Sequence, residues 1–166
     1  MKRFITPVLA SIALLAACGQ SEDPAARGSI AAATQGQPVM VSHCYLQVTK
    51  GAPRMEGNDT IPGTVDSLYI RLDILGELAN GVYNWLPGEK DRMTGTFQGS
   101  IEDSVITALY SYSAEGQTQK QEVLFKMGPG GLRIATGELV LSEGVNLFKD
   151  KSKCSYGEPV PEVPCK

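Results

Sequence analysis

The chain has 166 residues, of which 42% are hydrophobic and 20% charged, a balance typical of one globular domain rather than of a disordered chain. Its 15 Lys and Arg against 18 Asp and Glu give a formal net charge of -3, which excludes the basic surface of most nucleic-acid-binding proteins. A single histidine excludes a metal centre built from several histidines, and no cofactor or bound metal is expected.

Residues 1–17 have the pattern of a bacterial secretion signal. Lys2 and Arg3 form a positively charged start, and the apolar run after them is too short to cross ~30 Å of hydrocarbon comfortably as a permanent helix. The segment 15–18 (LAAC) resembles the lipobox of bacterial lipoproteins, in which the signal is removed before the cysteine and the thiol receives acyl chains such as palmitate. The sequence therefore predicts a lipid anchor at Cys18. An ordinary secretion signal with a coincidental cysteine is the alternative.

The residue after Cys18 bears on the destination of such a lipoprotein. It is Gly19 rather than aspartate, which in the best-known sorting rule permits transfer to the outer membrane. Each buried methylene of an acyl chain contributes ~0.8 kcal/mol, so two or three chains anchor a protein permanently. We expect an outer-membrane protein facing the periplasm, with the inner membrane and the cell surface as alternatives.

A linker is expected between the anchor and the folded body. Residues 19–38 are rich in Ala, Gly, Ser and Gln and contain almost no large apolar side chain that could build a core. Such a composition is typical of a flexible spacer. The predicted organisation is thus a signal at 1–17, a lipidated cysteine and linker at 18–38, a body at 39–155 and a proline-rich tail at 156–166.

The body has the pattern of β-strands. In residues 67–75, aliphatic side chains alternate with polar ones, the period of two that is typical of a strand with one buried face. Similar stretches lie at residues 41–49, 82–86, 94–101, 105–113, 119–127, 132–139 and 145–148. Glycine, proline, asparagine and acidic residues separate them, as expected for tight turns.

Eight short strands joined by tight turns predict an all-β fold, a small antiparallel up-and-down barrel of the lipocalin type. Closure hides the edges of the sheet, and eight strands enclose packed side chains or one small ligand. Gly95, Gly99 and Gly137 are placed inside predicted strands, where they would relieve the curvature. The tail at 156–166 contains three prolines and is predicted to form neither strand nor helix.

Three cysteines remain if Cys18 carries lipid, so one disulfide can form in an oxidising compartment. In a closed meander the first strand lies beside the last, which brings Cys44 toward the C-terminal segment, with Cys154 or Cys165 as its partner. Such a bridge would close a loop of about 120 residues and stabilise the fold by ~4–5 kcal/mol. A local bridge between Cys154 and Cys165 is the alternative.

Few residues suggest catalysis or metal binding. His43 adjoins Cys44, but adjacent residues on a strand point to opposite faces, so the pair is not expected to bind one metal ion. Glu89, Lys90 and Asp91 follow one predicted turn and Glu115 lies at another. Their carboxylates could act as an acid and a base, although charges at turns more often only face water.

Aromatic residues are spread over several predicted strands and either pack a core or line a cavity. They are Tyr69, Tyr83, Trp85, Phe97, Tyr110, Tyr112 and Phe125. Together with the charged turns, they define a candidate surface for a ligand or partner. Its members are Tyr83, Trp85, Glu89, Lys90, Asp91, Tyr112 and Glu115.

Several short motifs lie between Tyr83 and Glu138. They are Tyr83-Asn84, Glu89-Lys90-Asp91, Gly95-Thr96, Gly99, Tyr112, Glu115-Gly116, Glu122-Val123, Phe125 and Gly137-Glu138. In this order they resemble a family of small uncharacterised lipoproteins of Gram-negative bacteria, whose usual pattern is YN-x-x-EKD-x-x-x-GT-x-x-G followed by SEG and REV-x-F. The resemblance covers roughly residues 44–154. The sequence departs from the pattern by the inserted Pro87-Gly88, by Ser113-Ala114-Glu115-Gly116 in place of the SEG element with its phenylalanine, and by Gln121 in place of arginine.

The resemblance implies architecture and location rather than an activity. Members tend to have a cysteine at the start of the first strand and another near the C-terminus. This implies a bridge between Cys44 and Cys165, with Cys154 as the additional cysteine of this chain.

The expected function is that of a membrane-anchored, non-enzymatic binding or accessory module in the periplasm. Its partners would be the bilayer, through acylated Cys18, and either a small apolar ligand or an envelope protein. An aromatic-lined void of several hundred cubic ångströms would favour a lipocalin-like carrier of a small apolar ligand. A filled interior with an exposed apolar or acidic patch would favour a protein partner. A carboxylate-based hydrolase that uses Glu89 and Glu115 is the second alternative.

Overall fold

The computed structural model describes residues 38–166. The predicted signal peptide, the lipid attachment at Cys18 and nearly all of the predicted linker lie outside these residues. Between residues 38 and 166 there is no helix that combines the length and the apolar character needed to cross a membrane.

The described body is almost entirely β-structure, which confirms the predicted all-β class. Its strands are β1 (Val41–Lys50), β2 (Arg54–Glu56), β3 (Asp59–Ile61), β4 (Val65–Leu75), β5 (Leu78–Leu86), β6 (Met93–Glu102), β7 (Val105–Ala114), β8 (Gln117–Gly128), β9 (Gly131–Thr136), β10 (Leu139–Ser142), β11 (Val145–Phe148), β12 (Ser155–Tyr156) and β13 (Glu162–Val163). A 3-10 turn, η1 (Lys151–Lys153), is the one helical element of this part. The eight predicted stretches correspond to β1, β4 to β9 and β11, while the additional strands are short.

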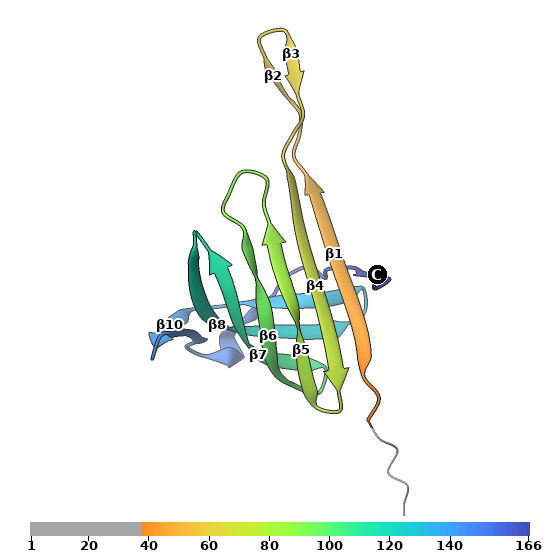
Figure 1. The fold of residues 1–166 in the computed structure, drawn as a ribbon, viewed down its shortest axis with the longest axis vertical. Coiled ribbons are helices and arrows are strands. Elements are labelled where there is room, and N and C mark those ends of the chain that lie inside the picture. Colours follow the sequence, from red (N-terminus) through yellow and green to blue (C-terminus); the bar gives the residue numbers. More distant parts are fainter. Residues whose placement is uncertain (1–37) are drawn as a thin grey trace, which may run out of the picture. The chain divides into compact units, whose positions relative to one another are not determined.

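Eleven strands form one mostly antiparallel sheet, and β2 and β3 form a separate hairpin that extends above the other strands (Figure 1). The strands β4 to β8 follow one another as hairpins, and β1 pairs with β4 along its whole length. The turns at 103–104, 115–116 and 143–144 have positive φ at both residues. This geometry suits two-residue hairpins because its twist matches that of the flanking strands.

The sheet does not close, so the predicted barrel is wrong in this respect. Closure would require β1 to pair with β9, and these two strands do not pair with each other. The C-terminal segment runs between them instead. On one side β12 pairs with β9, and Val160 exchanges two backbone hydrogen bonds with Leu132, of 2.8 and 3.0 Å. On the other side β13 pairs with β1 at Cys44 and Tyr45.

The prediction that residues 156–166 form no strand is also wrong, because prolines restrict pairing without preventing it. Pro159 and Pro161 have no N–H to donate, but Val160 between them pairs with β9. Proline still has a carbonyl oxygen, and that of Pro161 accepts a hydrogen bond from the backbone N–H of Leu46 at 3.1 Å. The tail therefore pairs with each of the two edges over only one or two residues at a time and forms no long strand.

Two of the glycines expected to relieve curvature, Gly95 and Gly99, lie in β6 as predicted. A β-carbon at either position would overlap backbone oxygens of β7, so only glycine allows these strands to approach so closely. Gly137 lies outside any strand. A β-carbon there would lie 2.8 Å from the sulfur of Cys154, and at this point the predicted stretch 132–139 divides into β9 and β10.

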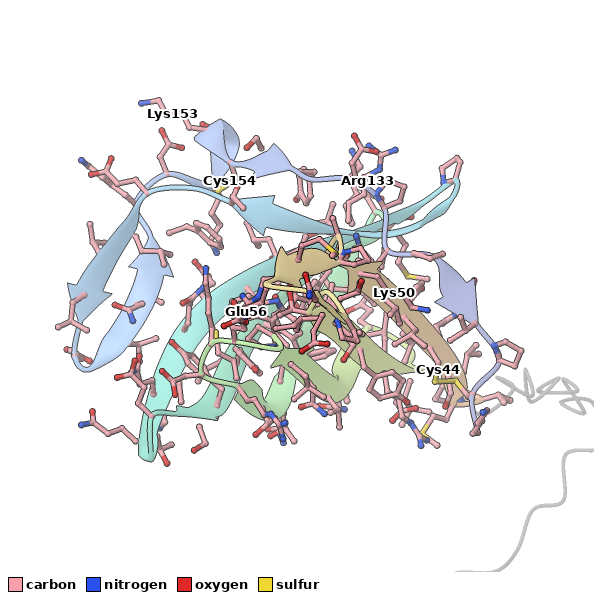
Figure 2. All side chains as sticks on the ribbon, turned by 90° about the horizontal axis from the view of Figure 1, so that it is seen from above. Cys44, Lys50, Glu56, Arg133, Lys153 and Cys154 are labelled. Atoms are coloured by element: carbon pink, nitrogen blue, oxygen red, sulfur yellow. A yellow bond between two sulfur atoms is a disulfide. The ribbon has the colours of Figure 1, made fainter. Side chains whose placement is uncertain are left out.

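One face of the sheet, here called the inner face, carries the core. On β4, Ile70 and Leu72 are fully buried while Arg71 and Asp73 point to the other face, as the alternation predicts. The whole core cluster consists of Tyr45, Ile70, Leu72, Ala79, Phe97, Ile106, Ala108, Tyr110, Tyr112, Val123, Phe125, Leu132 and Val160. Because Leu132 and Val160 belong to β9 and the tail, these segments cover part of the inner face. Figure 2 shows the strand with Arg133 crossing the fold opposite the long strands.

A disulfide joins Cys44 on β1 to Cys165, with 5.2 Å between their Cα atoms (Figure 2). This is the pairing that the family resemblance implies. Cys154 is a free thiol at the edge of a small second cluster formed by Leu124, Ala135 and Phe148. The bridge closes a loop across a sequence separation of 121 and holds the end of the tail against the first strand.

Candidate functional site

The inner face continues beyond the core toward the upper end of the sheet in Figure 1. On β1, Gln47 and Thr49 face the same side as Tyr45. On β4, Asp66 faces the same side as Leu68 and Ile70. Polar residues thus replace apolar ones on the same face of the same strands. The buried core ends at this point, and the polar side chains beyond it are available to contact a ligand.

A first hollow of about 430 Å³ lies at this change. Strands β1, β4 and β5 line one side, and β9 and the tail line the other. The lining residues are Gln47, Thr49, Asp66, Ser67, Leu68, Tyr83, Trp85, Ile134, Thr136, Gly157, Glu158 and Val160. The hollow therefore lies between the two strands, β1 and β9, that fail to pair.

A second hollow of about 420 Å³ lies at the ends of β5, β6 and β7. Its lining residues are Trp85, Glu89, Lys90, Asp91, Met93, Ala114 and Glu115. Trp85 lines both hollows, so they adjoin at this residue. We call the surface formed by the residues of both hollows the Trp85 groove.

The register of the sheet places Trp85 between apolar neighbours. It lies opposite Leu68 on β4 and opposite Met93 on β6, and all three side chains are half-buried. Trp85 is also the single tryptophan of the chain. The floor of the groove is thus apolar where the two hollows meet.

The rim of the groove is acidic. It contains one basic group, Lys90, and five carboxylates, those of Asp66, Glu89, Asp91, Glu115 and Glu158. Within the described part of the chain, none of these five carboxylates forms an ion pair with a basic side chain. Asp66 accepts a hydrogen bond of 2.8 Å from the backbone N–H of Gly88, which ties the β5–β6 loop to β4.

Aromatic side chains of β5, β7 and β8 pack against one another next to the first hollow. The ring of Tyr83 lies 4.9 Å from that of Tyr110 and 5.7 Å from that of Phe125, measured between centroids. The hydroxyl of Tyr110 donates a 2.7 Å hydrogen bond to the carbonyl oxygen of Tyr83. Burial raises the pKa of Tyr83 above its usual value, because a phenolate would be poorly solvated in this position.

The structure brings most of the predicted surface residues together. Tyr83 and Trp85 line the first hollow, and the second contains Trp85, Glu89, Lys90, Asp91 and Glu115. Tyr112 is not in the groove. Its ring is buried in the core against that of Tyr110, with 4.8 Å between centroids, and its hydroxyl donates to the Oε1 of Gln119 at 3.0 Å.

Sequence reasoning missed the half of the groove that β1, β9 and the tail provide. Asp66 could have been found, because it lies two residues before Leu68 and so faces the same side of the strand. Glu158 and Ile134 could not, because their positions depend on how the tail and β9 cross the inner face.

His43, considered above as a metal ligand, does not line the groove. The Nδ1 of His43 lies 2.8 Å from the Oε1 of Glu162, a contact that links β1 to the tail. Among residues 38–166 no three His, Cys, Asp or Glu side chains form a set that could hold a metal ion.

Comparison with known proteins adds no assignment. No protein-family model matches the chain, and neither a curated protein nor a solved structure matches it.

Proposed function

We propose that this protein is a lipid-anchored periplasmic lipoprotein whose β-body is a non-enzymatic binding module. The lipobox-like segment 15–18 and Gly19 support anchoring through acylated Cys18 at the outer membrane. The motifs between Tyr83 and Glu138 support membership of the small Gram-negative lipoprotein family that they resemble.

The observation that carries the binding role is the Trp85 groove. Five aromatic residues of the described body are buried in the core cluster, whereas the single tryptophan is half-buried and lines two hollows of about 430 and 420 Å³. Binding sites for small molecules typically have ~300–1,000 Å³ and combine an apolar lining with a few polar groups. The groove fits this description, and it is more open and more acidic than the interior of a carrier for purely apolar ligands.

The hydrolase alternative depends on Glu89 and Glu115, which line the same hollow. Both side chains are exposed to solvent. A catalytic acid acts best in a site from which much of the water is excluded, and an exposed loop does not provide one. The arrangement therefore supports binding better than catalysis.

The anchor is tested by labelling cells with a radioactive fatty acid while they express the full chain or Cys18→Ser. We expect label in the wild-type protein, in the outer-membrane fraction, and none in the variant. An unlabelled wild-type protein would refute the anchor. Label confined to the inner-membrane fraction would refute only the destination.

The binding role is tested by titrating the mature protein with a small-molecule extract of bacterial envelopes and following tryptophan emission. We expect a saturable change, because the one indole lines both hollows. Mass analysis of the extract afterwards separates binding from turnover. Turnover that Glu89→Gln abolishes would favour the hydrolase, and an unchanged emission would contradict the binding role.

A further inference from the structure

We propose that the Trp85 groove selects small organic cations that carry an apolar stem, such as alkylammonium compounds. This inference rests on the proposed binding role and adds the class of ligand. It follows from three features of the groove: the charge of its rim, the aromatic and apolar character of its floor, and its size.

The charge of the rim favours a cation. The groove is lined by five carboxylates and by one ammonium group, that of Lys90. No basic side chain of the described residues forms an ion pair with any of the five. Carboxylates that line the same hollow repel one another, and a bound cation removes part of this repulsion. A bound anion of the same size would add to the repulsion among the carboxylates and would bind more weakly.

The floor of the groove favours an organic cation over a metal ion. Trp85 can interact with an ammonium group through its ring face, an interaction for which tryptophan is the best aromatic residue. Leu68 and Met93 lie beside it in register and can contact the stem of a ligand. A hydrated metal ion would use neither of these contacts.

The size of the groove favours a small molecule over a folded partner. The two hollows have about 430 and 420 Å³ and adjoin at one side chain. Each lies within the usual range for small-molecule sites. Carboxylates line both hollows. An elongated cation that extends from one hollow to the other across Trp85 would therefore have acidic groups near each of its ends.

The opposite end of the sheet provides a matched comparison within the chain. A hollow of about 430 Å³ there is lined by Glu77, Ser100, Ile101, Glu102 and Asp103. It has three carboxylates, as the second hollow of the groove does, but no aromatic residue. If acidic charge alone were sufficient, both ends would bind cations equally well.

The test measures binding of hexylammonium, hexanol and hexanoate to the mature lipoprotein in a neutral detergent by calorimetry, with tryptophan emission as a second readout. We expect hexylammonium to bind about tenfold more tightly than hexanol, and hexanoate to bind most weakly. The affinity for hexylammonium should fall as salt is added, because exposed charges are screened.

Two triple variants with the same change in charge locate the effect. Glu89→Gln with Asp91→Asn and Glu115→Gln should weaken binding of hexylammonium about tenfold, and Glu77→Gln with Glu102→Gln and Asp103→Asn should change it less than about twofold. Equal losses in both would mean that only the overall charge matters, and would overturn the proposal.

The outcomes separate this inference from the binding role. Equal affinities for hexylammonium and hexanol, both lost in Trp85→Ala, would overturn cation selection and leave the groove as a binding site. No binding of any probe, together with unchanged emission in the envelope extract, would overturn both. Tighter binding of a short lysine-containing peptide than of hexylammonium would replace the small molecule with a protein partner.

Discussion

The core and the Trp85 groove are built from the same face of the same strands, yet they differ in what they can do. On β4, Ile70 and Leu72 are fully buried, whereas Asp66 lines the groove. Asp66 lies on the same face of this strand, four residues before Ile70. On β5, Ala79 is buried and Trp85 is half-buried. The alternation of side chains is identical in both regions, so it cannot be the origin of the difference.

The difference arises from what covers the inner face. Leu132 of β9 and Val160 of the tail pack into the core cluster, and the region beyond them is open. The tail reaches this position because two backbone hydrogen bonds join it to β9 and a disulfide joins it to β1. We infer that the covered region supplies the stability of the body, while the open region is free to bind.

The largest expected effect comes from opening the covered region. Phe125 is fully buried and contacts the rings of Tyr83 and Phe97, with centroids 5.7 and 5.1 Å away. Phe125→Ala should lower the free energy of unfolding by about 3–5 kcal/mol, because it leaves a cavity among aromatic rings. Chemical denaturation measures this, with the exposed Leu141→Ala as a control that should change stability little. Similar losses in both variants would contradict the assignment of the core.

The next largest effect concerns the attachment of the tail. Replacing Cys44 and Cys165 together by serine should lower the free energy of unfolding by about 2–5 kcal/mol, since the bridge closes most of the described chain into a loop. Cys154→Ser is the matched control, because its thiol is free. If Cys154→Ser had the larger effect, the disulfide would involve a different pair.

A smaller effect is expected at alkaline pH. Burial, with a contribution from the carboxylate of Glu162, raises the pKa of Tyr45 from its usual value of 10.0 to about 12. The unfolded chain therefore loses this proton at a lower pH than the folded protein does. The stabilisation is complete below pH 10 and is lost as the pH rises toward 12, by about 1 kcal/mol after allowance for solvent screening.

Denaturation at several pH values tests this, and Tyr45→Phe is the informative variant because it cannot ionise. Its stability should fall less between pH 10 and 12 than that of the wild-type protein. Burial also raises the pKa of Tyr83 and Tyr110, so part of the decline should remain in the variant. Identical pH profiles would show that Tyr45 is not protected as the structure indicates.

The smallest effect on stability is expected in the open region. Replacing the carboxylates of Glu89, Asp91 and Glu115 with amides should change the free energy of unfolding by only about 0.5 kcal/mol or less, because all three are exposed and form no ion pair with another residue of 38–166. Thermal unfolding measures this. If the free energy of unfolding fell by several kcal/mol, these loops would be needed for the stability of the fold. The core would then no longer differ from the groove in its contribution to stability.

Sequence reasoning recovered the long strands because each has a local signal. The alternation around Ile70 indicates a strand and which of its faces is buried. The turns at 103–104 and 115–116 indicate where strands end. Each of these signals involves residues that are close together in the sequence. It also placed Glu89 and Glu115 on one candidate surface, and the structure brings both to the same hollow.

The failures have a common physical cause. Whether the sheet closes depends on the competition between β1 and the tail for the edge of β9, and this is settled by contacts far apart in the sequence. The hydrogen bonds of Val160 and Pro161 are such contacts, and nothing in the local pattern of the proline-rich tail indicates them. Glu158 was missed for the same reason, because the tail carries it to the groove.

The most direct test of the account is an NMR titration of the isotope-labelled mature protein with hexylammonium. The single indole N–H signal belongs to Trp85 and needs no assignment. We predict that this signal shifts together with the backbone amides of Thr49 and Gly88, while those of Ile106 and Phe125 stay in place. A titration that moves amides around Glu77 and Glu102 but leaves the indole signal unchanged would contradict the account.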